Sequence, residues 1–162
     1  MLFHVGLENG DENRSIAWVL GHPGCFAYGP VPEAALSAVP QAIHAYQAWI
    51  VSHEGTSWIS TEDAEVRLEE SWQVYWINES FERAEDGYSV NAWFLDDWKQ
   101  LTALEVERGL ALLSWSRQDL DEIVKGLSRE VLEKRYPKER WSIDGILKHV
   151  GSAEWWYLDR LG

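Results

Sequence analysis

The spacing of apolar residues changes once along this chain, and that change constrains its fold more than any other feature. Within the first 95 residues, apolar and polar residues alternate over short segments, as they do in half-buried strands. From residue 102 onward, apolar residues recur every three or four positions, as they do on one face of a helix. We therefore expect an α+β protein in two parts. Residues 1–95 would form a small antiparallel sheet with one packed helix, and residues 96–162 would be helical.

The strands of the first part are predicted from five segments: 3–7, 16–20, 22–29, 66–76 and 88–94. The first two predict a hairpin, because a polar turn joins them. In the fourth segment the alternation changes phase near Glu70 and Ser71, which predicts a bulge or a short break. The pair Asp86-Gly87 directly before the last segment is a strong turn signal.

One helix is predicted between the third and fourth strands. Pro32 suits its first turn, Glu33 complements the positive helix N-terminus, and Gly55 is a natural stop. We expect Pro40 to kink this helix, because proline cannot donate a backbone hydrogen bond. Its apolar stripe comprises Leu36, Val39, Ile43, Tyr46 and Ile50.

Two amphipathic helices are predicted in the second part, packed antiparallel over a short connection. Thr102 and Glu105 have the spacing of a capping box, and Ser142 is a good N-cap for the last helix. Tyr136-Pro137 breaks the chain between them. The apolar stripe of the last helix comprises Ile143, Ile146, Leu147, Val150, Ala153, Tyr157 and Leu161.

The charge of the chain is concentrated in its first part. Residues 1–96 hold 15 Asp or Glu against 3 Lys or Arg, whereas residues 97–162 hold 12 against 11. Such an acidic surface repels phosphate backbones, so we do not expect the first part to bind nucleic acid. An acidic domain can instead bind a basic protein, and simple solubility is the alternative explanation of the charge.

Tryptophan and cysteine usage bear on the core and on the cell compartment. The chain has 11 tryptophans, which either anchor the core and interfaces or line a ligand pocket. Cys25 is the only cysteine, so an intrachain disulfide is excluded. Without disulfides, a leader-like start or a long apolar run, the sequence favours a cytoplasmic protein with no membrane segment. A nucleophilic Cys25 is not expected. Its segment is a turn leading into a strand, and an acidic surface raises the pKa of a thiol.

Residues 16–50 resemble the HicB-like antitoxin family. The resemblance rests on a strand ending in Pro-Gly-Cys, an aromatic strand, and Pro-Glu-x-Ala-Leu opening a helix. It implies a small sheet backed by one helix and a toxin-binding role. The DNA-binding tail that many HicB proteins carry is not visible in this sequence.

Residues 141–161 resemble the second helix of the DinB superfamily, through Trp-Ser-Ile, Ile-Leu-x-His and Ala-Glu-x-Trp-Tyr. The resemblance implies a four-helix bundle that holds a divalent metal, zinc or nickel, with three histidines, and a metal-dependent thiol transferase or hydrolase. His149 matches the metal ligand of the second helix. The other two ligands usually lie four residues apart on a fourth helix, and no such helix is present here.

Three interpretations of His149 stay open: a metal ligand in a dimer or a longer protein, a relic of such a site, and an ordinary histidine beside the core. Glu154 is a poor co-ligand because it lies about 140° around the helix from His149.

Two helices also leave an apolar face that must be covered by the sheet, by a second copy of the chain, or by further chain of a longer protein. We expect either an enzyme-derived protein, inactive alone, or an antitoxin-like module that binds a basic partner.

Overall fold

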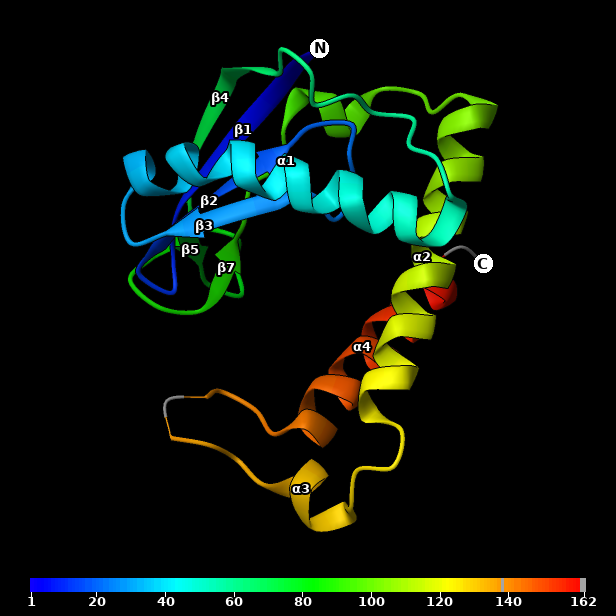
Figure 1. Ribbon diagram of the computed structural model, residues 1–162. Coiled ribbons are helices and arrows are strands. Elements are labelled where there is room, and N and C mark those ends of the chain that lie inside the picture. The colour runs from blue at the N-terminus through cyan, green and yellow to red at the C-terminus, as the bar shows by residue number, and fades with distance from the viewer. Residues whose placement is uncertain (138, 161–162) are drawn as a thin grey trace. The chain divides into compact units, whose positions relative to one another are not determined.

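The computed structural model describes residues 1–137 and 139–160, whose contacts divide the chain into two units (Figure 1). The first unit is Met1–Leu113, and the second begins at Ser114. The mixture of a small sheet with helices confirms the α+β class predicted from the change in periodicity.

A four-stranded sheet forms the centre of the first unit. Its strands are β1 (Leu2–Asp11), β2 (Arg14–Val19), β3 (Phe26–Gly29) and β4 (Glu65–Gln73), in the order β3-β2-β1-β4. The strands β1 and β2 form the predicted hairpin, but β4 pairs with β1 in parallel. The prediction of a purely antiparallel sheet is therefore wrong. A helix lies between β3 and β4, and a helical crossover can bring β4 in parallel, which a tight turn cannot.

The register of β1 and β4 contains the irregularity that the phase change near Glu70 predicts. Val5 lies opposite Leu68, but the next residue, Gly6, lies opposite Glu70, so Glu69 is an extra residue in β4. A bulge of this kind bends the strand and redirects the side chains that follow it.

Helix α1 (Pro32–Glu54) lies against one face of this sheet (Figure 1). It continues through Pro40 and ends at Gly55, whose backbone has φ 79° and donates a hydrogen bond to the carbonyl of Val51. The core between helix and sheet contains Phe3, Val5, Leu7, Ala17, Val19, Ala27, Ala35, Val39, Ile43, Tyr46 and Ile50. The predicted stripe of the helix is buried except for Leu36, whose place is taken by Ala35.

The opposite face of the sheet carries the segment that follows a second, smaller sheet. The strands β5 (Tyr75–Ile77), β6 (Arg83–Ala84) and β7 (Tyr88–Val90) form this antiparallel sheet in the order β6-β5-β7. The last predicted strand is shorter than expected, because it ends at Val90. Beyond it, the buried ring of Phe94 lies over Gly6 of β1, where an added Cβ would come within 2.6 Å of the ring.

A short 3-10 helix, η1 (Leu95–Trp98), and the start of α2 (Ala103–Val124) complete the first unit. The predicted capping box of α2 is confirmed. The amide of Thr102 donates to the Glu105 carboxylate at 2.8 Å, and the amide of Glu105 donates to the Thr102 hydroxyl at 3.2 Å. The contact boundary between the units falls inside α2, later than residue 95.

The second unit contains the end of α2, a short helix α3 (Arg129–Glu133) that was not predicted, and α4 (Ile143–Arg160). The predicted cap of α4 is confirmed, because the Ser142 hydroxyl accepts from the amide of Gly145 at 3.1 Å. Figure 1 shows α4 returning beside α2, and Arg117 is hydrogen-bonded to Glu154 between them. Leu161, the last residue of the predicted stripe, lies outside the described residues.

The apolar face of α4 is open in the single chain. No described residue of α4 belongs to the buried class. Its exposed large side chains are Ile146, Trp155, Trp156, Tyr157 and Leu158. A covering partner, a second copy of the chain included, remains a prediction. Within residues 1–137 and 139–160, none of the helices has the length and apolarity needed to cross a membrane.

Candidate functional site

The predicted metal ligand His149 is an exposed side chain in the middle of α4. Its ring lies 4.3 Å, centroid to centroid, from the ring of Trp141, which precedes the helix. Glu154 pairs with Arg117, so its carboxylate already has a partner on α2. The role of His149 as a metal ligand therefore stays a prediction of the DinB resemblance.

The described residues do not bring other metal ligands together with His149. Across 1–137 and 139–160, no group of three or more His, Cys, Asp or Glu side chains is placed to hold a metal ion. A three-ligand site of the kind that the resemblance implies would need donors from another chain or a further segment.

Cys25 lies beside a shallow depression of about 400 Å³ between β3 and α1, which is also lined by Phe26, Tyr46 and Trp49. The cysteine is buried, and burial raises the pKa of its thiol to about 12. A thiol with this pKa is almost entirely protonated at neutral pH and is a poor nucleophile. The low reactivity of Cys25 stays a prediction, which burial of the thiol supports.

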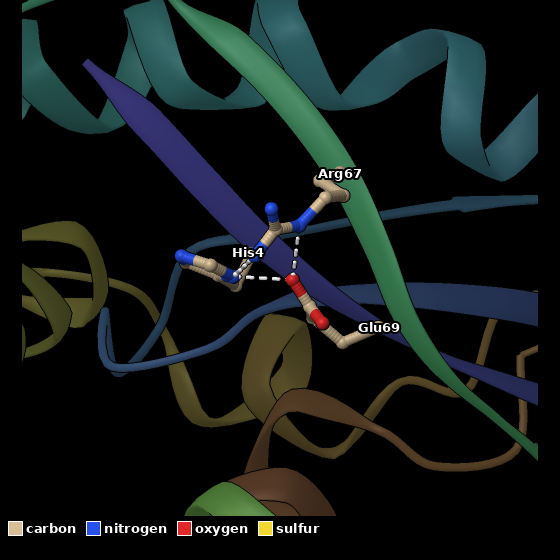
Figure 2. Close-up of polar contacts among 3 residues, drawn as sticks. All are labelled: His4, Arg67 and Glu69. Carbon is tan, nitrogen blue, oxygen red and sulfur yellow. Dashed lines mark hydrogen bonds and ion pairs between the residues drawn. The ribbon is translucent and has the colours of Figure 1, made fainter.

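A cluster of three charged or titratable side chains joins β1 to β4 (Figure 2). The Glu69 carboxylate lies 2.5 Å from His4 Nδ1 and accepts a hydrogen bond from Arg67 Nε at 2.5 Å. The bond from Arg67, and then the bond to His4, holds the pKa of Glu69 below its ordinary value. A carboxylate can orient a histidine for proton transfer, but these three side chains are not among those lining the depression beside Cys25. The cluster therefore links the two strands.

Three other carboxylates hold the segment that crosses the open face of the sheet. The buried Glu8 accepts from the amide of Ala92 at 2.6 Å. Glu70 and Asp97 accept from the amides of Leu95 and Phe94, at 2.9 and 2.6 Å. Glu70 and Asp97 each belong to an adjacent acidic pair, a pattern that usually means solvated charge. Glu70 reaches its amide from a distant segment, for which the sequence carries no local signal, whereas Asp97 accepts from an amide three residues before it, at the start of η1.

The tryptophans do not form the core. All 11 lie within the described ranges, and none belongs to the buried class. Their interpretation as core anchors is therefore wrong, because the core between α1 and the sheet is built from smaller aliphatic side chains and single phenylalanine and tyrosine rings. Exposed indoles are instead typical of interfaces, where the ring supplies apolar area and the N–H a polar contact.

Burial favours the neutral form of the His22 side chain. Its ring lies 5.3 Å from that of Phe3 and 6.3 Å from that of Tyr46. Burial lowers its pKa below the ordinary value of 6.5, and the positive charges of Lys99 and Arg108 lower it further. The folded chain therefore keeps this imidazole neutral at a pH where a free histidine takes up a proton.

We expect the chain to lose stability as the pH falls below about 6.5, because unfolded His22 binds a proton that the folded state excludes. This contribution is fully present above that pH and is lost as the pH falls toward the lowered pKa of the folded state. The measurement is the urea midpoint at about pH 7.5 and about pH 5.5. His22→Gln should reduce the difference between the two midpoints, while the control His44→Gln, at an exposed position, should retain it. Parallel pH profiles for His22→Gln and the wild type would contradict the assignment.

Comparison of the chain with protein-family models, with curated proteins and with solved structures finds no match. The HicB-like and DinB-like resemblances therefore remain predictions from residues 16–50 and 141–161. What supports a function is the distribution of charge and of exposed aromatic side chains within the described units.

Proposed function

We propose that the first unit is a protein-binding module whose ligand is a basic segment of a partner protein. Residues 1–113 hold 18 Asp or Glu against 5 Lys or Arg, a net charge of −13. The remaining residues hold 9 of each and are neutral. The whole formal charge of the chain is therefore concentrated in the unit that contains the sheet.

One observation carries the proposal: the cations of this unit already have partners within it. Every one of the five is engaged by an acid or an aromatic ring of the same unit. The pairs are Arg14 with Glu12 and Tyr28, Arg67 with Glu69, Arg83 with Tyr75, Lys99 with Asp96 and Glu105, and Arg108 with Trp58. The acids of the unit outnumber its cations by 13, so most of its carboxylates have no cation to neutralise them.

The excess of carboxylates defines which ligands the unit attracts. Its field repels phosphate backbones and draws in basic segments, raising their association rate. The resemblance of residues 16–50 to HicB-like antitoxins supports the same proposal, because it implies a toxin-binding role. A metal-dependent thiol transferase or hydrolase remains the alternative implied by the DinB resemblance, with His149 as its one proposed ligand.

The experiment measures binding of a defined basic peptide to the full chain by isothermal titration calorimetry. The peptide is an acetylated and amidated alternation of arginine and alanine, and the control peptide has neutral citrulline in place of each arginine. We expect saturable binding of one arginine peptide per chain. Its affinity should fall as salt rises from about 50 to about 300 mM, and the citrulline peptide should not bind.

Two results would contradict the proposal. One is the absence of arginine-peptide binding at the lower salt concentration. The other is binding that never saturates at a defined ratio, because that is the behaviour of a diffuse counterion atmosphere and not of a protein-binding surface.

A further inference from the structure

Three adjoining tryptophans of the first unit are here called the tryptophan patch: the half-buried Trp72 and the exposed Trp93 and Trp98. The ring of Trp93 lies 5.2 Å from that of Trp72 and 5.7 Å from that of Trp98. Trp93 is 49% exposed and Trp98 is 72% exposed. Adjoining indoles with this much open surface are typical of contact sites for a partner.

The patch is held in place by hydrogen bonds on both sides. The indole N–H of Trp72 donates to the carbonyl of Val90 at 3.2 Å. The amides of Ala92 and Phe94, which flank Trp93 in the chain, donate to Glu8 and Asp97. A surface fixed in this way loses little conformational freedom on binding, so contacts made to it contribute more of their energy to affinity.

The same hydrogen bonds bring negative charge to the backbone that carries Trp93. Glu8, Glu70 and Asp97 each accept a hydrogen bond from a backbone amide of residues 92–95. A partner with only neutral, apolar side chains would remove water from Glu70 and Asp97 without replacing it, which is costly. A cation both lies favourably on an indole face and compensates the carboxylates.

Arginine suits this surface better than lysine, because its planar guanidinium stacks on aromatic rings and pairs with carboxylates. The unit already uses such contacts internally. The guanidinium of Arg83 lies 4.0 Å from the ring centre of Tyr75, and that of Arg108 lies 5.2 Å from the ring of Trp58. Among the described residues, no Lys or Arg of this chain lies over a ring of the tryptophan patch.

We propose that the tryptophan patch binds an arginine side chain of the basic partner, with the guanidinium stacked on Trp98 or Trp93 beside the carboxylates of Glu70 and Asp97. The inference rests on the proposed function and locates the contact within the first unit.

The experiment repeats the arginine-peptide titration with Trp98→Leu and with Trp98→Phe. The large exposure of Trp98 makes either change compatible with folding, which the circular dichroism spectrum checks. We expect Trp98→Leu to weaken binding about three- to tenfold and Trp98→Phe to weaken it less, because a phenyl ring attracts a cation less strongly than an indole. The matched control Phe81→Leu, at another exposed aromatic position of the same unit, should bind as the wild type does.

Charge is tested separately with Glu70→Gln and Asp97→Asn, which keep an acceptor oxygen for the backbone amides. Each substitution should weaken binding of the arginine peptide and reduce the dependence of its affinity on salt. Unchanged affinity in Trp98→Leu, or an equal loss in Phe81→Leu, would overturn the site while leaving the proposed function intact. If the wild type fails to bind the peptide at all, the proposed function falls, and this inference falls with it.

Discussion

Replacing Phe94 with alanine is expected to lower the free energy of unfolding by about 3–5 kcal/mol. The ring is 4% exposed and covers Gly6 in the central strand, so its removal leaves a cavity against the sheet. Urea unfolding followed by circular dichroism measures the loss. The matched control is Leu95→Ala, one residue further along at an exposed position, which should change stability by less than about 0.5 kcal/mol.

The contact between Phe94 and Gly6 can also be tested from the glycine side. A Cβ at position 6 would lie 2.6 Å from the ring, so Gly6→Ala should destabilise the wild type by about 1–3 kcal/mol. In the Phe94→Ala background the same change should cost much less, because the ring is gone. Additive effects of the two substitutions would show that they do not share this contact.

Ile43→Ala should lower the free energy of unfolding by about 2–5 kcal/mol. Ile43 lies on the face of α1 that packs on the sheet and is 1% exposed. The control on the same helix is Val51→Ala, an exposed position that should stay within about 0.5 kcal/mol of the wild type. Both changes remove side-chain carbon from one helix, so the difference between them isolates burial. Equal losses would mean that packing on the sheet does not determine the result, since alanine has a higher helix propensity than isoleucine or valine.

Most elements of the fold could be predicted because their signals are local. The ends of α1 follow from Pro32 and Gly55, and the start of α2 follows from Thr102 with Glu105. The direction of β4 could not be predicted in this way, because alternation shows which residues share a face but not which strand lies beside them. The short α3 escaped prediction because five residues are too few to show a helical period.

The candidate sites were less predictable than the fold. The carboxylates of Glu70 and Asp97 have partners in Leu95 and Phe94, and only the tertiary structure brings Glu70 to its amide. The sequence raised the number of tryptophans as a question, and the two answers were anchors of the core and interfaces or the lining of a ligand pocket. None of the tryptophans is buried in the core, because side chains as large as indole lie around the edges of this small core and not inside it.

The place of β1 in the sheet has a consequence for the order in which the chain can fold. β1 is synthesised before both of its partner strands, and it pairs with β2 on one side and β4 on the other. The hairpin with β2 can form as soon as both strands leave the ribosome. The other edge of β1 stays unpaired until β4 emerges, some sixty residues later, as the contact between Met1 and Asp63 illustrates. A nascent chain therefore presents an open strand edge throughout the synthesis of α1, which is when it is most exposed to pairing with another chain.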